Sequence, residues 1–390
     1  ACMLWALSST ALVVRDMENV SGKAIVLLGF AVGGALGLRV GGAFAVIYLI
    51  LLVIWRAWLD HRASGSPVLS RLLRMVLVLL PAAVLAFVFM AICWPWSVID
   101  VDNILEAAES FSHFDFNMQT MANGVMYNIS DVPRSYLFQY LAVKLPEAAL
   151  LGLATIPLLW LACRNALKAA DIQTRITMHT LLAGIILPLM FVLNDKPALY
   201  NGVRHFTFLL PLLAILSAWS VLTVYDALAN SRWNGRVVYQ SLWAGVVAGL
   251  MLVTLVDIVQ LHPFEYVRLN RLAGDQKQAQ FNWEGDYWSS ALREATNQLQ
   301  AMKLPERSQP YWIGACVDTP QIEPYLDRRF KVTRRWEEAD FYISTTNMHC
   351  HEVMKGKVIV NIERQGMSLA VVKDRRHLQA ADRLATPAKN

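Results

Sequence analysis

The chain has 390 residues, of which 56% are hydrophobic and only 17% are charged, and its mean hydropathy is +0.38. Soluble domains carry about 25% charged residues, so this composition excludes an ordinary soluble protein. The formal net charge of +5 is small and dispersed, which argues against nucleic acid as a partner. We predict an α-helical polytopic membrane protein over residues 1–261, followed by a small soluble α/β domain over 262–390.

The chain opens on the apolar stretch ACMLWALSSTALVV, which has no initiator Met and no charged segment before it. A secretory signal peptide carries a positively charged segment ahead of its apolar core, so this stretch reads instead as the end of a membrane span. We therefore expect further residues before Ala1 in the natural protein.

A helix needs about 20 apolar residues to cross the hydrocarbon core of a bilayer. An early and long apolar stretch, 24–55, is interrupted by Arg39 and by the pair Gly41 and Gly42. We interpret it as two short helices that meet at this break. The further candidate spans are 75–97, 146–163, 176–193, 205–226 and 238–261.

Lys and Arg in short loops predict the orientation, because positively charged loops stay on the cytoplasmic side. Three loops carry such residues, namely Arg56, Arg62, Arg71 and Arg74, then Arg164, Lys168 and Arg175, then Arg232 and Arg236. With these loops in the cytoplasm, the break at Arg39, segments 98–145 and 194–204, and everything after Leu261 face outward. We expect a multi-pass protein of the inner (plasma) membrane with an extracytoplasmic C-terminal domain.

The long outer segment 98–145 and the residues just before it are rich in aromatic side chains. Such rings collect at membrane interfaces, and those of this region are Trp94, Trp96, Phe111, Phe114, Phe116, Tyr136 and Phe138. We predict that the segment contains helices lying on the outer surface.

The soluble part alternates one helical pattern with several strand patterns. Leu292, Ala295, Leu299 and Met302 repeat at helical spacing. Strands are predicted in 311–318, 331–336 and 339–345, and 357–374 reads as a hairpin that turns at Gln365 and Gly366. The part contains no GxGxxG, P-loop or serine-elbow motif.

Cysteine and histidine offer few candidate sites in this part. Cys316 and Cys350 are its only cysteines, and a disulfide between them is one alternative if the domain faces an oxidising compartment. His349 and His351 point to the same side of an extended chain, but no third ligand accompanies them, so we predict no metal site.

Four stretches, in this order, resemble bacterial integral-membrane glycosyltransferases of the GT-C superfamily. They are GLRVGGAFAVIYLIL, SHFDFNMQTMANG with VPRSYLFQYLAVKLPE, LYNGVRHFTFLLPLLAIL, and LHPFEYVRLNRLAG with FNWEGDYWSSALREA. The most similar group is family 39, which is related to protein O-mannosyltransferases and to the aminoarabinose transferase of lipid A. The resemblance covers about Gly22 to Leu299.

This resemblance implies transfer of a sugar from a polyprenyl-phosphate carrier to a lipid, glycan or protein acceptor on the outer side of the membrane. It also implies an acidic catalytic residue in an N-terminal outer loop, acting as general base or orienting a divalent cation. No acidic pair that fits this loop precedes Val20, so we expect the catalytic acid before Ala1. Within the chain, Asp195 and Asp115 are the first candidates.

A donor of this kind carries an anionic phosphate, and breaking its bond to the sugar leaves more negative charge on that phosphate. Arginine suits this role, because its planar fork stays protonated and donates two parallel hydrogen bonds. Arg204 and His205 at the start of an apolar run, and Arg39 at the helix break, are the main candidates. Arg204 alternatively extends to the lipid headgroups, and His205 alternatively serves only in packing.

Other polar residues of the outer segments are weaker candidates for the same site. Lys196 and Arg134 are further phosphate donors, although solvated loop charges need no special role. Tyr200 and Asn201 are candidates for sugar binding, although a simple turn also explains this Tyr-Asn-Gly sequence. The stretch WEGDYW, with Glu284, Asp286, Tyr287 and Trp288, is interpreted mainly as a joint between the last span and the soluble domain, with a direct role in acceptor binding as the alternative.

Two functions compete with the enzyme. A membrane protein that binds or translocates lipid-linked sugars needs the same arginines but breaks no bond, and a structural subunit needs only a partner for its outer domain. The chain shows no inverted repeat and only one broken span, which speaks against a transporter.

Overall fold

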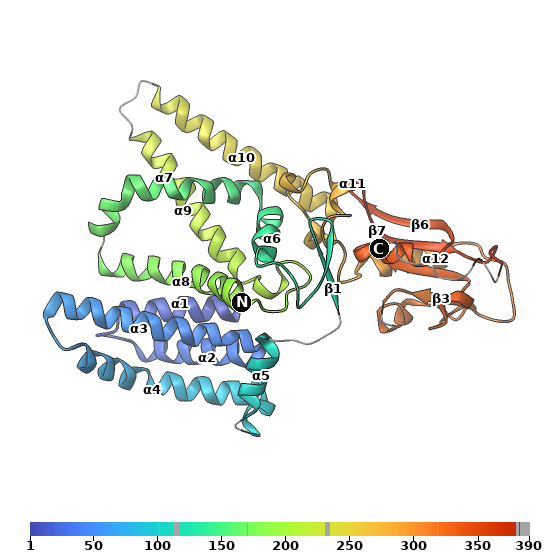
Figure 1. The fold of residues 1–390 in the computed structure, drawn as a ribbon. Coiled ribbons are helices and arrows are strands. Elements are labelled where there is room, and N and C mark those ends of the chain that lie inside the picture. The colour runs from blue at the N-terminus through green and yellow to red at the C-terminus, as the bar shows by residue number, and fades with distance from the viewer. Residues whose placement is uncertain are drawn as a thin grey trace.

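The computed structural model describes residues 1–100, 102–112, 118–169, 171–230, 235–317, 319–379 and 382. Long helices lie side by side in one region, and a small α/β region follows beyond one end of them (Figure 1). The long helices are α1 (Cys2–Arg15), α2 (Gly22–Leu38), α3 (Ala43–Ser64), α4 (Val68–Cys93), α7 (Glu147–Ala169), α8 (Ile172–Asp195), α9 (Leu209–Ala229) and α10 (Arg236–Leu261).

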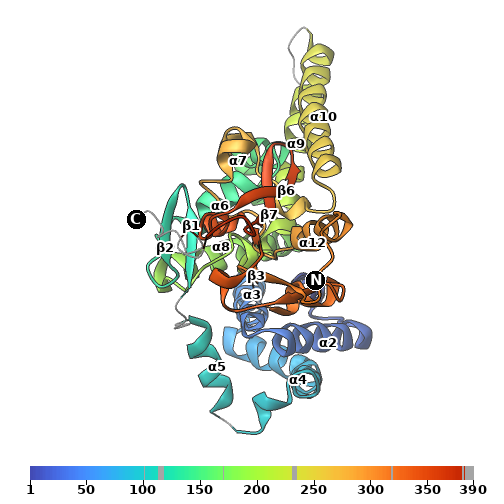
Figure 2. The same cartoon turned by 90° about the vertical axis from the view of Figure 1, so that its right-hand side faces the viewer.

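Five of these helices, α3, α4, α8, α9 and α10, are long and apolar enough to cross a membrane. The short helix α6 (Tyr136–Lys144) and the first part of α7, Glu147–Leu161, form a bent pair with 118° between them, which is either a broken sixth span or a re-entrant loop. These lengths indicate a multi-pass membrane protein. Helix α10 packs on α7 and α9 but otherwise projects away from the other helices (Figure 2).

The predicted break between 24 and 55 is confirmed, since α2 ends at Leu38 and a short 3₁₀ turn over Val40–Gly42 leads into α3. The prediction of two short helices is wrong for α3, which has 22 residues and continues to Ser64. Its polar end is helical because Arg56 and Asp60, one turn apart, form a buried ion pair of 2.9 Å. Arg56 also donates to the carbonyl oxygens of Val14 and Arg15 at the end of α1.

Helix α2 packs closely on α4 through a row of glycines. Gly29, Gly33 and Gly37 recur every four residues and therefore share one face of the helix. A methyl group at Gly33 would lie 2.5 Å from the carbonyl oxygen of Ala86 on α4. Small residues at such spacing let two membrane helices approach backbone to backbone, so the end of α2 that carries Arg39 is held firmly.

The segment before α7 contains two helices, as predicted, but α6 is largely buried instead of lying on a surface. Helices α5 (Asn103–Ser112) and α6 lie across the ends of the long helices, near the α/β region (Figure 1). A two-stranded hairpin, β1 (Gln119–Ala122) and β2 (Val125–Asn128), was not predicted. It turns at Asn123 and Gly124, whose φ angles of 50° and 77° suit this pair.

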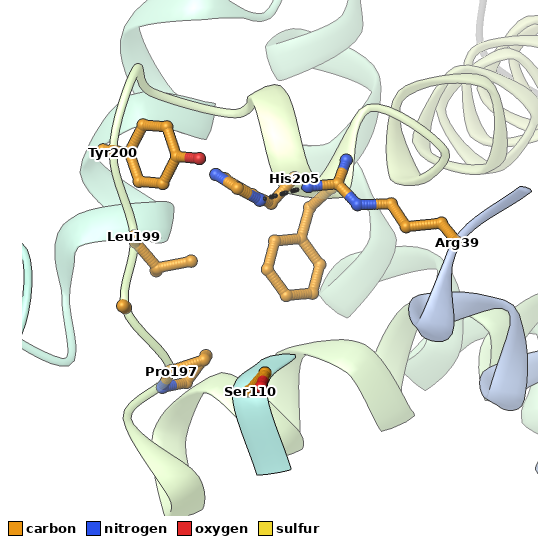
Figure 3. A pocket seen from close by; sticks show the side chains of 8 residues that line it. Arg39, Ser110, Pro197, Leu199, Tyr200 and His205 are labelled. Carbon is orange, nitrogen blue, oxygen red and sulfur yellow. Dashed lines mark hydrogen bonds between the residues drawn. The ribbon is translucent and has the colours of Figure 1, made fainter. Parts of the chain in front are cut away.

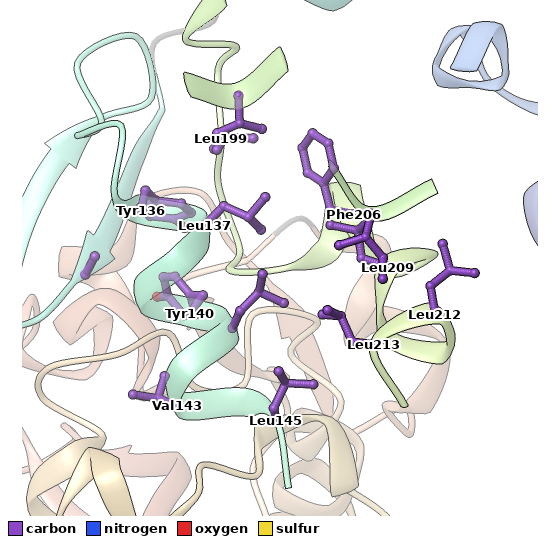
Figure 4. Close-up of a cluster of buried hydrophobic side chains, with 14 of the residues drawn as sticks. Tyr136, Leu137, Tyr140, Val143, Leu145, Leu199, Phe206, Leu209, Leu212 and Leu213 are labelled. Carbon is purple, nitrogen blue, oxygen red and sulfur yellow. The ribbon is translucent and has the colours of Figure 1, made fainter. Parts of the chain in front are cut away.

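A buried cluster joins α6 to the loop between α8 and α9 and to the start of α9 (Figure 4). Tyr136, Leu137 and Tyr140 of α6 are fully buried, and Leu137 points toward Leu199 and Phe206. This cluster fixes the loop 197–206, in which most of the predicted site residues lie.

The C-terminal region is the predicted small α/β unit, with strand order β4-β3-β5-β7-β6. Its elements are α11 (Gln276–Ala279), α12 (Ala291–Ala301), β3 (Tyr311–Ala315), β4 (Phe330–Val332), β5 (Phe341–Thr345), β6 (Lys357–Arg364) and β7 (Met367–Asp374). The strand β3 runs parallel to β4 and β5, and β7 runs antiparallel to β5 and β6. The predicted turn at Gln365 and Gly366 is confirmed, and Cys316 and Cys350 form a disulfide.

A buried ionic cluster joins this unit to the helices. Asp257 of α10 accepts hydrogen bonds from Arg268 at 3.1 Å, from Arg271 at 2.7 and 2.8 Å, and from Gln365 at 3.0 Å. Arg268 also pairs with Glu147 of α7 at 2.7 Å. The cluster therefore connects α7, α10, the segment after α10 and the turn between β6 and β7.

Candidate functional site

The helix break brings Arg39 to His205, which lies in the short 3₁₀ turn η3 (Arg204–Phe206) before α9. The Nη2 atom of Arg39 donates a hydrogen bond to Nδ1 of His205 over 2.7 Å, across 166 residues of sequence (Figure 3). The turn after Arg39 is tight because Gly42 packs on the backbone of Ala35, where any side chain would collide. The predicted convergence of Arg39 and His205 is thus present.

Two cavities meet at this pair. The first, of about 150 Å³, is lined by Arg39 and His205, by Ser110 of α5 and by the loop 197–200 with Tyr200 (Figure 3). The second, of about 180 Å³, adds Arg204 and a mostly apolar wall that includes Phe44. The remaining apolar lining of the second cavity includes Met3, Leu38, Phe206 and Phe208. A cavity of mixed polar and apolar lining and a mostly apolar cavity therefore share one cationic boundary.

The imidazole of His205 is neutral in this arrangement. Arginine can only donate hydrogen bonds, so Nδ1 of His205 must accept and its proton must be on Nε2. Burial, then the charges of Arg39 and Arg204, lower the pKa of His205 from 6.5 to about 4. Nε2 is buried and has no hydrogen-bond partner among the described residues. The site thus contains a buried N–H donor without an acceptor.

This lowered pKa predicts that acid destabilises the folded protein through His205. The unfolded chain binds a proton as the pH falls through 6.5, whereas the folded chain does so only near 4. The contribution of His205 to the free energy of unfolding is therefore fully present above pH 6.5. The free energy of unfolding falls by about 1–3 kcal/mol as the pH is lowered from 6.5 to 4. Thermal unfolding of the purified protein, measured at several pH values in this range, checks the prediction. The melting temperature should depend less on pH in His205→Asn than in His262→Asn, which removes an exposed histidine. An equal dependence of the melting temperature on pH in both variants would contradict the prediction.

Arg204 is held between two aromatic rings. Its Cζ atom lies 4.2 Å from the ring centre of Trp288 and 5.5 Å from that of Tyr200. With the Asn201 amide oriented so that its nitrogen faces Glu284, its oxygen accepts a hydrogen bond of 3.1 Å from Nη1 of Arg204. Among the described residues none accepts from Nε or Nη2 of Arg204. Stacking on its faces leaves these edge donors available for an anion.

The other predicted residues lie farther from the cavities. Asp195 and Lys196 are exposed at the end of α8, and Arg134 is exposed before α6; none of the three lines either cavity. Asp115 lies outside the described residues. Tyr200 lines the first cavity, with its ring 4.6 Å from that of His205.

Asn201 is buried and faces Glu284 and Arg204, and it lines neither cavity. Its place is therefore behind the arginine, where it contacts the protein interior. This position fits a supporting role better than the sugar-binding role predicted for it.

Sequence reasoning underestimated the stretch WEGDYW. Asp286 does form a joint, because it accepts hydrogen bonds from the N–H groups of Ser290 and Ala291 at the start of α12 and from Tyr266. Glu284 and Trp288, however, reach the loop that carries Arg204. Burial raises the pKa of Glu284. No spacing or motif in the sequence indicates this proximity.

The described residues contain no group of three or more His, Cys, Asp or Glu side chains that could hold a metal ion. They therefore do not fit the divalent cation that the resemblance leaves open. Comparisons with family models, with curated proteins and with solved structures found no match for the chain. Its function has to be inferred from the chemistry of this site.

Proposed function

We propose that the chain belongs to a membrane glycosyltransferase that uses a polyprenyl-phosphate-linked sugar as donor. The observation that carries this proposal is the meeting of Arg39, Arg204 and His205 where a cavity that also presents Ser110 and Tyr200 adjoins a mostly apolar one. A lipid-linked sugar has three parts that match this arrangement: a sugar for the first cavity, a phosphate for the cations, and a hydrocarbon chain for the apolar second cavity.

In the proposed complex the phosphate lies between the two arginines. Arg39 and Arg204 donate to its oxygens, and the unpaired Nε2–H of His205 adds a neutral donor. The sugar occupies the first cavity beside Tyr200, and the first isoprenoid unit lies against Phe44 in the second.

Transfer forms a bond between the acceptor hydroxyl oxygen and the anomeric carbon and breaks the bond from that carbon to the phosphate oxygen. The bonding electrons leave with the polyprenyl phosphate, where fixed donors stabilise the added charge. A base takes the acceptor's proton. We assign no residue to this step, because Asp195 lies outside both cavities and Asp115 lies outside the described residues.

The location of the site agrees with an outward-facing reaction. Arg39 lies at the end of the helices near the α/β region, whereas Arg62 and Arg71 lie at the opposite end, where α3 connects to α4 (Figure 1). Basic loops favour the cytoplasm. We therefore propose that the site and the α/β region face the outer side of the inner membrane, where lipid-linked donors meet glycan, lipid or protein acceptors.

The proposal is tested with the full chain in lipid nanodiscs, a panel of synthetic polyprenyl-phosphate hexoses and a membrane extract as source of acceptors. We expect release of polyprenyl phosphate in step with a glycosylated product, and we expect Arg39→Ala to lose most of it. Arg134→Ala, which removes an exposed arginine outside both cavities, is the control. Donor binding without release would instead identify a carrier, and the absence of binding would favour a structural subunit.

A further inference from the structure

Glu284 is a buried carboxylate with hydrogen-bond donors on both oxygens. Its side chain is almost inaccessible, at 1% exposure. Oε1 accepts from the hydroxyl of Thr120 at 2.5 Å and from the N–H of Met121 at 3.2 Å, and Oε2 accepts from the amide of Asn347 at 3.1 Å. Burying a carboxylate costs free energy even when it is hydrogen-bonded, so this residue calls for an explanation beyond packing.

The contacts of Glu284 come from three separate parts of the chain. Thr120 and Met121 belong to the β1–β2 hairpin, and Asn347 follows β5 of the C-terminal sheet. The third part is the loop before α9, where the Asn201 amide nitrogen lies 3.3 Å from Oε2 in the orientation that also satisfies Arg204. Glu284 is therefore the point at which the hairpin, the sheet and the Arg204 loop meet.

Two tyrosines of α6 reinforce this meeting point. The Tyr140 hydroxyl donates to the carbonyl of Met121 at 2.5 Å and accepts from the N–H of Glu284 at 3.0 Å. The Tyr136 hydroxyl bonds with Thr120 at 2.8 Å and accepts from the N–H of Gly202 at 3.0 Å. These bonds fix the backbone of Glu284 and that of Gly202, the residue after Asn201.

Glu284 is connected to the guanidinium of Arg204 through a single residue, Asn201. Glu284 orients the amide of Asn201, and that amide accepts from Nη1 of Arg204. Trp288, four residues after Glu284, stacks on the same guanidinium at 4.2 Å. One short segment of the C-terminal region thus reaches Arg204 in two ways, indirectly through the amide of Asn201 and directly through the ring of Trp288.

We propose that Glu284 is a positioning residue that, through Asn201, holds Arg204 in the orientation required to bind the phosphate of a lipid-linked donor. This inference rests on the proposed function and deepens it, because it makes the C-terminal region part of the donor site. Glu284 itself lines neither cavity and acts only through the arginine.

The test is a double-mutant cycle on the full chain in nanodiscs, with geranylgeranyl phosphate as the binding probe. Glutamine has the shape of glutamate, but its N–H₂ group would face hydrogen-bond donors where a carboxylate oxygen now accepts. Because this disturbs the contacts that orient Asn201 and hence Arg204, Glu284→Gln should weaken probe binding about tenfold. In an Arg204→Ala background the same change should have no further effect, because the residue through which it acts is gone. Glu323→Gln, a Glu-to-Gln change at an exposed position of the C-terminal unit, should leave binding unchanged.

A second variant keeps the proposal testable if Glu284→Gln does not fold. Asn201→Gly removes the amide while tolerating the φ angle of 55° at this position, and it should behave as Glu284→Gln does. If either variant weakens binding further in the Arg204→Ala background, or if a folded variant binds the probe as the unaltered protein does, the positioning role is wrong while the proposed function stands. If the unaltered protein does not bind the probe, the proposed function itself fails.

Discussion

Replacing Arg204 with Ala is expected to lower the rate of polyprenyl phosphate release by about 10²–10³-fold, the loss typical of removing one fixed donor from a transition state. The charge on the leaving phosphate grows as its bond to the sugar breaks, so the arginine contributes more to the transition state than to the bound donor. The change should therefore appear mainly in kcat. Single-turnover release from a synthetic donor in nanodiscs measures it.

Arg204→Lys separates charge from shape. Lysine keeps the positive charge but lacks the planar group that stacks between Trp288 and Tyr200 and bonds to Asn201. We expect it to recover only a small part of the lost rate. Normal turnover by folded Arg204→Ala would refute the proposed phosphate role.

Replacing Asp257 with Ala is expected to destabilise the protein by about 3–5 kcal/mol, the usual cost of removing one partner from a buried ion pair. Asp257 is 1% exposed, and Arg268, which is 7% exposed, would keep only Glu147 as a charged partner. The variant should also loosen the C-terminal unit, because Gln365 loses its bond to α10.

Thermal unfolding in detergent measures this loss. Asp226→Ala, at an exposed position near the other end of the bundle, should change the melting temperature little. An unchanged melting temperature in Asp257→Ala would contradict the prediction.

Much of the fold could be predicted because its signals are local. An apolar run of membrane length predicts a helix wherever it occurs, and a charge next to two glycines predicts the break at Arg39. The hairpin over 357–374 follows from alternating apolar residues around Gln365 and Gly366. The Asn123-Gly124 pair is a comparable local signal for the turn of the β1–β2 hairpin.

The ends of helices and the partners of the site could not be predicted, because both depend on long-range contacts. Helix α3 extends past its apolar run because Arg56 and Asp60 form an ion pair along it. Arg56 also donates hydrogen bonds to the carbonyl oxygens at the end of α1. Arg39 and His205 could be placed on one face of the membrane from loop charges. That Glu284 lies behind Arg204 follows from packing that no spacing in the sequence reveals.

The scattered origin of the site has a consequence for biosynthesis. Arg39, Ser110 and His205 line one cavity, but the ring that stacks on Arg204 comes from Trp288. Domains generally fold from the N-terminus onwards as a chain is synthesised, so the helices are in place before this ring has been made. On the proposed topology, the final step of assembly is the export and docking of the segment after α10, and in a nascent chain that has not yet reached Trp288 the guanidinium of Arg204 lacks one of its two aromatic partners.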